Sequence, residues 1–305
     1  MIITHLVTHS GGFHADELLS SVVLTRLFPE ADLVRSRDAA WITPAAGRII
    51  YDVGRAYDPE AGIFDHHQRP NPLRPDGQPY SSFGLIWAHF GRDYLRALSV
   101  PEEEIDTVHA AVDTGFVLPV DLVDNGAIEP SQAGVLAGLT LPSLLETLKP
   151  PFDARTEGAD DAAFRAALEV ARPFLEAAAA QAAAKRRAAA IVAEAIARAG
   201  ESPILELPMG MPFRAAIEAA GADHLLFVVH PREGGDWALT TIRKGGNTFE
   251  SRADLPEAWA GLNGAALEAV TGVAGAVFCH NARFIAVARS REAILEMAAQ
   301  AVAAL

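Results

Sequence analysis

The fold of the first part of the chain is decided by residues 1–28, which read MIITHLVTHSGGFHADELLSSVVLTRLF. Met1–Thr8 is apolar and rich in β-branched residues, which predicts a strand. In Asp16–Phe28 the apolar residues recur at helical spacing, and Pro29 is expected to end the helix. A strand followed directly by a helix is the repeating unit of α/β folds, so we expect the chain to open such a fold.

The same alternation of strands and helices continues to residue 150. Ala31–Arg35 and Arg48–Val53 predict further strands, and Ser82–Leu98 predicts a helix. The proline-rich segment 69–79 between them is expected to be a loop. Strands that alternate with helices indicate a mainly parallel sheet covered by helices on both faces.

The alanine-rich stretch that follows predicts a long helix over residues 160–199, with Gly200 as its C-cap. Pro173 is expected either to kink this helix or to begin a second one. We interpret residues 151–202 as a helical spacer between two domains.

The last third of the chain, residues 203–305, predicts a smaller α+β domain. Apolar runs at 225–230 and 237–242 flank Gly234-Gly235 and predict a hairpin. Arg291–Leu305 predicts a closing helix. The expected organisation is therefore an α/β domain over 1–150, the spacer, and this second domain.

Charge and composition limit the partners and the compartment of the protein. The net charge of −14 argues against a general duplex-binding surface, although divalent ions in an acidic pocket would still accommodate a phosphate substrate. Cys279 is the only cysteine, which excludes a disulfide within the chain and indicates a reducing compartment. The first residues lack the features of a signal peptide, and no apolar run is long enough to span a membrane. We therefore expect a cytoplasmic protein without a membrane partner.

Residue types that bind metal ions follow three of the apolar runs. In chain order they are His9, His14 and Asp16, then Asp52, and then Asp65-His66-His67. Taken singly, Asp16 is explained as a helix N-cap and Asp52 as a turn residue. Because the carboxyl ends of parallel strands meet at one edge of a sheet, the three segments together predict a divalent-metal site. The mixture of imidazole and carboxylate ligands suits Mn²⁺, Co²⁺ or Zn²⁺.

A fourth segment is expected to add a carboxylate to this site. We favour Asp124, supported by Asp121, in the sequence DLVDNG at 121–126. Asp113 is an alternative, because it stands at a similar helix end. The spacing of the three residues does not separate them.

Several motifs along the chain together resemble a known protein family. They are His9 with HADE (14–17), VRSRD (34–38), YDVG (51–54), YDP (57–59), FDHHQR (64–69), SSFGLI (81–86) with HFG (89–91), VDLVDNG (120–126), SR (251–252) with LPEAW (255–259), and FCH (278–280) with FI (284–285). In order and spacing they resemble the melanocyte-proliferating-gene (Myg) family, a branch of the DHH phosphoesterase superfamily. The resemblance extends over nearly the whole chain.

This resemblance implies a DHH-like, metal-binding catalytic domain over residues 1–150 and a substrate-binding domain over 203–305. Superfamily members cleave phosphodiesters or phosphoanhydrides, and the eukaryotic relatives act as 3′-to-5′ exoribonucleases. The chain is therefore expected to be a metal-dependent hydrolase that acts on single-stranded RNA or short oligonucleotides. One or two divalent ions are expected, with Mn²⁺ foremost and Mg²⁺, Co²⁺ or Zn²⁺ as alternatives.

The resemblance also suggests a role for each candidate residue. The expected metal ligands are His9, His14, Asp16, Asp52, Asp65, His67 and Asp124, with Asp52 or Asp124 as the bridge between two ions. The expected catalytic residues are His66, Asp65 and His67, with His66 as a general acid or a phosphate contact. The expected substrate-binding residues are Arg69, Arg252, His280 and Arg283. The guanidinium groups of the three arginines suit phosphate, and His280 is included because of the family resemblance.

Two other kinds of function use the same residues. The first is a small-molecule phosphatase or pyrophosphatase, or a cyclic-dinucleotide phosphodiesterase, which would need the same metal ions. The second is a non-catalytic, metal-binding regulatory protein, for which a closed coordination sphere would be typical. The sequence leaves these alternatives open, together with formation of a homo-oligomer.

Overall fold

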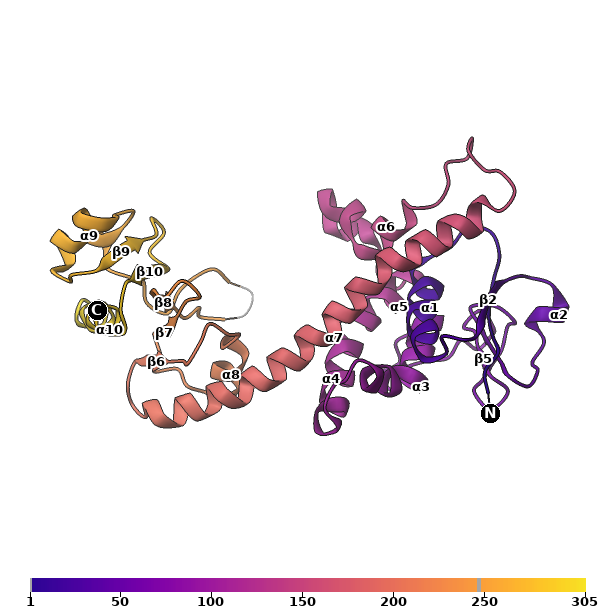
Figure 1. Cartoon of the computed structure of the whole chain (residues 1–305), viewed down its shortest axis with the longest axis horizontal. Helices are drawn as coiled ribbons and strands as arrows, with labels where there is room; N and C mark the ends of the chain where they lie inside the picture. Colours follow the sequence, from indigo (N-terminus) through magenta and orange to yellow (C-terminus); the bar gives the residue numbers. More distant parts are fainter. Residues whose placement is uncertain (1, 246–247) are drawn as a thin grey trace. The chain divides into compact units, whose positions relative to one another are not determined.

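The computed structural model describes residues 2–245 and 248–305, and Figure 1 traces the order of its helices and strands. The chain packs into two compact units, Met1–Ala183 and Ala184–Leu305. Each unit contains one five-stranded sheet and its own hydrophobic core.

The sheet of the first unit is mainly parallel, as the sequence predicts. Its strands, in spatial order, are β2 (Asp32–Arg35), β1 (His5–Thr8), β3 (Arg48–Tyr51), β5 (Ile63–Phe64) and β4 (Tyr57–Asp58). The pairs β1–β2, β1–β3 and β3–β5 are parallel, whereas β4 joins the edge in antiparallel orientation. The carboxyl ends of β1, β3 and β5 therefore lie at the same edge of the sheet.

Helices cover both faces of this sheet, because successive side chains of a strand point to opposite faces. On one face, Leu6, Ile49 and Phe64 pack into a core formed with α1 (Ala15–Leu27) and α3 (Ser82–Ala97). On the other face, a second apolar cluster lies under the short helix α2 (Ala39–Ile42), and its members are Val7, Val34, Trp41, Ile42, Ile50, Val53, Ala56 and Ile63. Burial of each large apolar side chain contributes about 1.5–3 kcal/mol. The predicted α/β architecture with helices on both faces is confirmed.

Asp113, Asp121 and Asp124 lie in the helices that follow α3. These helices are η1 (Glu102–Glu104), α4 (Ile105–Val112), η2 (Asp113–Val117), α5 (Leu118–Asp124), η3 (Pro130–Leu139) and α6 (Leu141–Glu146). The η2 segment is a π-helical turn between α4 and α5. Such turns insert an extra residue into a helix and often occur at functional sites.

A single helix of 41 residues, α7 (Ala159–Ala199), runs through Pro173. The alternative in which Pro173 begins a second helix is therefore wrong. Phe164, Leu168 and Leu175 of α7 pack into the core of the first unit, whereas Val192 packs into a core of the second. The apolar contacts on both sides of Pro173 offset the lost backbone hydrogen bond. The division into residues 1–150, 151–202 and 203–305 as independent domains stays a prediction.

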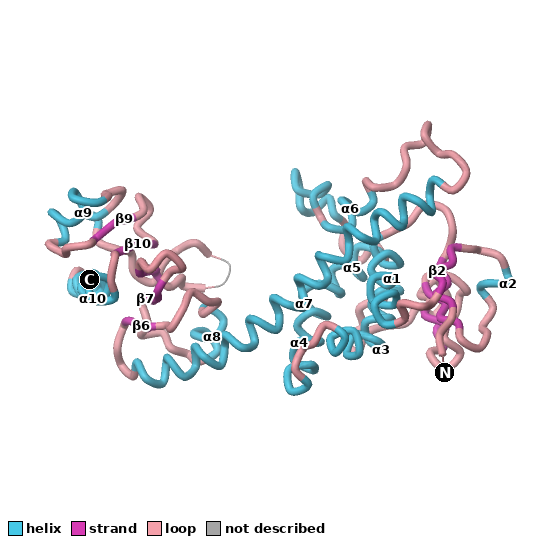
Figure 2. The backbone as a smooth tube through the Cα atoms, viewed as in Figure 1, coloured by secondary structure: helices cyan, strands magenta, loops and turns pink. Residues whose placement is uncertain are grey.

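The sheet of the second unit has mixed strand directions. In spatial order its strands are β6 (Ile204–Glu206), β7 (Phe227–Pro231), β8 (Trp237–Thr241), β10 (Ile285–Ala288) and β9 (Ala276–Cys279). Only the β6–β7 pair is parallel among these described strands, and the predicted hairpin joins β7 to β8. Besides the end of α7, the helices of the unit are α8 (Arg214–Ala219), η4 (Glu257–Trp259), α9 (Gly264–Thr271) and α10 (Arg291–Ala303). Figure 2 labels α8, α9 and α10.

The two faces of this sheet form separate cores. Phe227 and Val229 pack with Met297 of α10, whereas Val228 between them packs with Ile217 of α8. This arrangement of strands and helices is the predicted α+β unit. Within residues 2–245 and 248–305, no helix combines the length and hydropathy that a membrane span requires.

Candidate metal centre

The candidate ligands meet at the edge of the first sheet where the parallel strands end. His9 follows β1, Asp52 follows β3, and Asp65-His66-His67 follows β5. Helix α1 begins at the same edge, with Asp16 and Glu17 in its first turn. Ligands from segments far apart in the sequence are thus brought together, as the parallel topology predicts.

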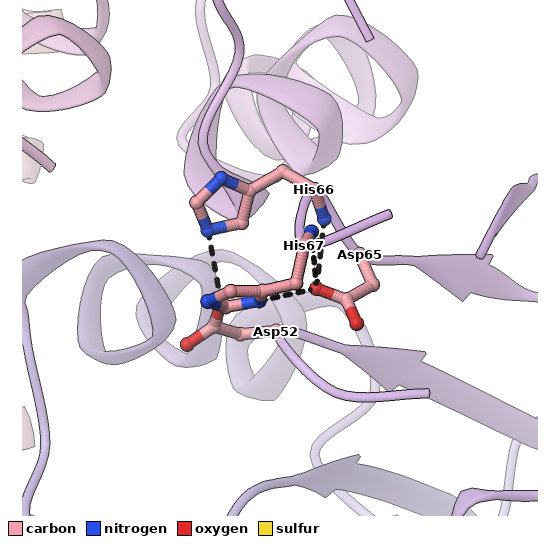
Figure 3. A group of neighbouring side chains, drawn as sticks. All are labelled: Asp52, Asp65, His66 and His67. Carbon is pink, nitrogen blue, oxygen red and sulfur yellow. Dashed lines mark hydrogen bonds and ion pairs between the residues drawn. The ribbon is translucent and has the colours of Figure 1, made fainter. Parts of the chain in front are cut away.

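Asp52 is at the middle of this group, and Figure 3 shows its carboxylate beneath the His66 ring. One oxygen, Oδ1, lies 3.3 Å from His66 Nε2 and 3.6 Å from His67 Nδ1, and it accepts a 3.2 Å hydrogen bond from Ser82. The other oxygen, Oδ2, lies 3.1 Å from His9 Nε2. Burial would raise the pKa of Asp52, but the hydrogen bonds with His66 and His9 hold it well below its usual range. A buried carboxylate that contacts three imidazoles has the position expected of a bridging metal ligand.

The backbone conformation of Asp52 explains how its side chain reaches the centre. Its φ angle is +55°, in the left-handed region that aspartate tolerates better than most residues. The chain therefore turns sharply as β3 ends, and the Asp52 side chain no longer follows the alternation of side chains between the two faces of the sheet. Residues in sparsely populated backbone regions cluster at functional sites.

His9 is held between two carboxylates. Its Nε2 atom lies 3.0 Å from Glu17 Oε1 and 3.1 Å from Asp52 Oδ2. Burial would lower the pKa of His9, but the hydrogen bonds with Asp52 and Glu17 outweigh it and raise the pKa to about 10. Both oxygens of Glu17 also accept the backbone N–H of His14, the exposed residue at the start of α1. Glu17 is fully buried and was not among the ligands predicted from the sequence.

Asp16 is a buried carboxylate with unused hydrogen-bonding capacity. Among the described residues, no group donates a hydrogen bond to either of its oxygens. Burial raises its pKa well above the usual value, and the charges of Asp52, Asp124 and Glu17 raise it further. Leaving a buried carboxylate unsatisfied is costly unless a cation or a proton compensates it. The surroundings of Asp16 therefore fit a bound divalent cation.

His66 contacts three carboxylates through one ring nitrogen. Its Nε2 atom lies 3.3 Å from Asp52 Oδ1, 3.3 Å from Asp124 Oδ2 and 3.9 Å from Asp16 Oδ2. Burial would lower the pKa of His66, but the hydrogen bond with Asp52 and the charge of Asp124 raise it. The other ring nitrogen, Nδ1, lies 3.4 Å from Asn125 Oδ1. His66 Nε2 is therefore the atom that faces the centre.

Asn125 fixes the tautomer of His66. The amide nitrogen of Asn125 donates to the backbone carbonyls of Tyr80 at 3.0 Å and Asp121 at 2.9 Å, so its oxygen is the atom that faces His66. That oxygen accepts from Asn71 Nδ2 as well. An acceptor at this position requires His66 Nδ1 to carry the proton.

Asp65 organises the turn that presents the two histidines. Its carboxylate accepts the backbone N–H groups of Arg55 at 2.6 Å, His66 at 2.7 Å and His67 at 3.2 Å. It also contacts His67 Nδ1 at 2.8 Å. Burial would raise the pKa of Asp65, but the hydrogen bonds from His67 and the Arg55 backbone lower it, and the same bond raises the pKa of His67. Asp65 thus holds the motif in place and keeps His67 Nδ1 close to Asp52.

The structure distinguishes Asp113, Asp121 and Asp124, among which the sequence did not decide. Asp121 accepts hydrogen bonds from Ser81 Oγ at 2.6 Å and from the backbone of Gly84 at 3.1 Å. Arg74 donates to Asp121 at 2.7 and 3.0 Å and to Asp113 at 2.7 and 3.0 Å. Only a glycine fits at position 84, because a Cβ atom there would lie 2.2 Å from the Asp121 carboxylate. Asp121 and Asp113 therefore form a structural ion-pair network, whereas Asp124 faces His66.

Replacement of Arg74 by methionine is expected to destabilise the first unit. The guanidinium is buried, and its loss leaves the Asp113 and Asp121 carboxylates without their cation. Removing one partner of a buried ion pair costs about 3–5 kcal/mol of unfolding free energy. Urea denaturation measures the change. The exposed pair Arg92–Asp106 supplies the control, because Arg92→Met is expected to cost at most about 1 kcal/mol. Equal losses in the two variants would contradict the assignment.

The candidate ligand atoms form four overlapping groups. Within each group the atoms lie within 4.8 Å of one another, and the groups are Asp52, Asp65, His66 and His67; His9, His14 and Glu17; Asp16, His66 and Asp124; and Asp16, Glu17 and Asp52. A cavity of about 400 Å³ opens beside them and is lined by His14, Asp52, His66, His67 and Asp124, among others. Ligands beside an open cavity are typical of catalytic metal sites, which keep a coordination position for water or substrate.

Metal binding to this centre is expected to release protons. The pKa of His9 is raised to about 10, so its proton stabilises the fold fully below about pH 6.5, and this contribution is lost as the pH rises towards 10. A metal ion competes with that proton, so its apparent affinity should increase with pH. Titration calorimetry of Mn²⁺ binding at pH 7 in two buffers of different ionisation enthalpy measures the release. Identical binding enthalpies in both buffers would contradict the expectation.

The residues predicted to bind substrate have other contacts in the structure. Arg252 donates to the carbonyls of Ala222 and Leu225 at 2.8 and 3.1 Å, within the second unit. Arg283 contacts Asp254 at 3.1 Å, and His280 Nδ1 accepts the backbone N–H of Ala282 at 2.9 Å. Arg69, in the first unit, is exposed just after the His67 turn. The substrate-binding role of these four residues stays a prediction.

Comparisons with known proteins identify the family of the chain. The family model MYG1_exonuc, described as an uncharacterised protein family (UPF0160), matches residues 5–302. The MYG1 exonuclease of Mus musculus is 34% identical over 319 residues, which cover 95% of this chain and 83% of that protein. The MYG1 exonuclease of Homo sapiens is 33% identical over 320 residues, covering 95% and 84%. The MYG1 protein of Schizosaccharomyces pombe is 32% identical over 323 residues, covering 98% and 97%.

Among solved structures, the crystal structure of RecJ in complex with Mn²⁺ from Thermus thermophilus matches 98% of this chain. The match covers 52% of RecJ, so this chain spans about half the length of that protein. The sequence identity is 15% and the TM-score is 0.28, values too low to support an argument about this chain. The family model and the curated relatives, which match along nearly the full length, show that the chain belongs to the MYG1 family.

Proposed function

We propose that the chain is a divalent-metal-dependent phosphodiesterase that acts as a 3′-to-5′ exonuclease on single-stranded RNA or short oligonucleotides. The observation that carries the proposal is the cluster of buried carboxylates around Asp52, in which Asp16 has no hydrogen-bond donor among the described residues. The names of the relatives, MYG1 exonuclease, support a nuclease reaction. The RNA specificity and the direction of digestion are expectations from the family resemblance.

The residues of the centre divide into proposed roles. His9, His14 and Asp16, with Glu17 added from the structure, would hold one divalent ion. Asp65 and His67 would hold a second, and a bound ion lowers the pKa of a water molecule and neutralises phosphoryl oxygens. We propose Asp52 as the bridging ligand, because its two oxygens face His9 on one side and His66 on the other. Asp124 would complete the site from α5.

His66 is the proposed proton donor or phosphate contact. Its Nδ1 proton is held by Asn125, so Nε2 is directed towards the carboxylates of the centre. Nε2 is thus the ring atom from which a protonated His66 would donate to a leaving oxygen. His67, which is half-exposed beside the cavity, keeps its proposed role as a ligand of the second ion.

The ligand set bears on the choice of metal. Imidazole nitrogen and carboxylate oxygen together suit Mn²⁺, Co²⁺ and Zn²⁺, whereas Mg²⁺ prefers oxygen ligands and water. We therefore propose Mn²⁺ first, with one or two ions bound. A cytoplasmic location and self-association of the chain also stay predictions.

A substrate panel tests this function. The purified protein is incubated in Mn²⁺ with end-labelled single-stranded RNA, dinucleotides, a cyclic dinucleotide and pyrophosphate. We expect RNA shortened from its 3′ end to mononucleotides, and no reaction after chelation of the metal. Consumption of pyrophosphate or the cyclic dinucleotide alone would favour the small-molecule alternatives. A stably bound metal without hydrolysis of any substrate would favour the non-catalytic regulatory protein.

A further inference from the structure

A basic cavity lies in the second unit, at the end of β8 and along the segment that follows it. Its volume is about 770 Å³. Four of its lining residues carry a positive charge, and they are Arg214, Arg243, Lys244 and Arg252. This local charge contrasts with the net charge of −14 on the whole chain. A positively charged hollow in an acidic protein is the kind of surface that binds an anion.

Two of these cations are not neutralised by the protein itself. The carboxylates that line the cavity are already paired, Glu250 with Lys244 and Asp254 with Arg283. Arg252 contacts Asp223 at 3.2 Å. In the part of the chain that the structure describes, no carboxylate lies within 4.0 Å of the guanidinium of Arg214 or of Arg243. These two groups are therefore available to a ligand.

The two free guanidinium groups also repel each other. Burial lowers the pKa of Arg214, and the charge of Arg243 lowers it further. An anion bound between them would remove this repulsion. Guanidinium groups bind phosphate oxygens with two parallel hydrogen bonds, so a phosphate is the anion that fits best.

An exposed aromatic side chain stands beside these cations. Phe249 lines the same cavity and is 87% exposed, and the guanidinium carbon of Arg243 lies 4.5 Å from the centre of its ring. Phe284, at 43% exposure, lines the cavity as well. Exposed aromatic rings next to unpaired cations are typical of sites for single-stranded nucleic acid, where bases stack on rings and cations hold the backbone.

The basic surface continues into a neighbouring cavity. This second hollow, of about 450 Å³, shares Arg214 and Thr240 with the first and adds Lys185. All of these residues belong to the second unit. Two adjoining hollows with a shared arginine offer room for more than one nucleotide, since sites for single small ligands span roughly 300–1,000 Å³.

We propose that this cavity binds single-stranded nucleic acid, with Arg214 and Arg243 on backbone phosphates and Phe249 stacked on a base. The inference rests on the proposed function, because it names the contacts that the nuclease makes with its substrate. It adds residues that the sequence did not single out. The polar groups of Arg252 and Arg283, by contrast, contact the protein's own carbonyls and carboxylates.

Binding without cleavage tests the proposal. Fluorescence anisotropy measures the affinity of the full chain for a labelled single-stranded oligonucleotide, in chelator so that the strand stays intact. We expect R214A/R243A to bind at least about 10-fold more weakly, and the slope of log affinity against log salt to fall by about 1.4 for two lost phosphate contacts. F249A is expected to bind about 10-fold more weakly, because a stacking contact is lost. Tripolyphosphate, which has no base, is expected to compete poorly.

Matched controls separate this inference from the proposed function. Arg232 is exposed on the β7–β8 hairpin, outside both cavities. R232A removes one positive charge, as each single replacement R214A or R243A does, and should bind within about 2-fold of the parent. Unchanged affinity and salt slope in R214A/R243A would overturn the inference even if the protein hydrolyses RNA. Tripolyphosphate that competes as well as unlabelled oligonucleotide, together with F249A that binds as tightly as the parent, would make the cavity a site for anions alone. That result would also overturn the inference. Binding that depends on the two arginines in a protein that hydrolyses nothing would overturn only the proposed function.

Discussion

Asp52→Asn is expected to lower kcat/KM for phosphodiester hydrolysis by roughly three orders of magnitude, or about 4 kcal/mol of transition-state stabilisation. The carboxylate oxygens of Asp52 face His9 on one side and His66 and His67 on the other. Asparagine keeps the shape but removes the negative charge, so the position can no longer bridge two cations. Steady-state kinetics in Mn²⁺, with metal content measured on the same sample, record the loss.

The matched control for this variant is Asp32→Asn. Asp32 is exposed in β2, so its replacement makes the same chemical change away from the centre. We expect its kcat/KM to stay within about 2-fold of the parent, because surface substitutions have small effects. The bridging role of Asp52 is wrong if D52N retains full activity while its circular dichroism and metal content match those of the parent.

The second large effect is expected for His66→Gln, which should lower kcat by about 10²–10⁴-fold, the contribution typical of a general acid. Glutamine is uncharged and does not donate a proton at neutral pH. If His66 donates the proton to the leaving oxygen, the alkaline limb of the pH–rate profile should disappear with it. Stopped-time assays over pH 5–9 measure both effects.

His89→Gln is the control for this substitution, because His89 is an exposed helix residue that packs beside Phe64 and Phe90. Its activity should match that of the parent. Metal affinity separates two roles for His66. Loss of activity with metal affinity preserved within about 10-fold supports the proton donor, whereas parallel loss of metal and activity contradicts it and makes His66 a ligand.

The parts of the centre that could be predicted from the sequence are those fixed by local pattern. His9 and Asp52 follow apolar runs that read as strands, and parallel strands bring their carboxyl ends to one edge. Their meeting depends on periodicity and topology, both of which a single sequence carries. No strand was predicted before the Asp65-His66-His67 motif; the structure adds it as β5, parallel to β3.

The distinction between Asp124, Asp121 and Asp113 could not be predicted, because it depends on a distant partner. Arg74 lies in the proline-rich loop, 47 and 39 residues along the sequence from the two carboxylates that it contacts. Local spacing makes the three aspartates equivalent. Only tertiary contacts show that Asp113 and Asp121 pair with Arg74, whereas Asp124 contacts His66 of the centre.

Glu17 was missed for a different reason. Adjacent residues on a helix point in directions about 100° apart, so a helix that begins near Asp16 does not by itself indicate that Glu17 serves the same centre. Both lie in the first turn of α1, near Asp52 at the end of β3, and both are buried. A signal was present in the sequence, since Glu17 stands three residues after the helix start, the position of a capping-box glutamate.

Pro173 shows how packing overrides a local rule. A proline inside a helix removes one hydrogen bond and costs about 3 kcal/mol, which made a break a reasonable prediction. The buried neighbours Ala171 and Leu175 lie on the face of α7 that packs into the core of the first unit. Their burial offsets the cost, so the helix continues.

Diffraction from crystals soaked in Mn²⁺, with anomalous data collected at the manganese edge, determines whether a metal ion binds beside Asp52. We expect an anomalous peak within about 2.5 Å of an Asp52 carboxylate oxygen, with ligands from His9, Asp16 or Asp124 in the same coordination sphere. Saturated crystals with no peak within about 4 Å of Asp52 would contradict this expectation, because the buried carboxylates would then be balanced by protons alone.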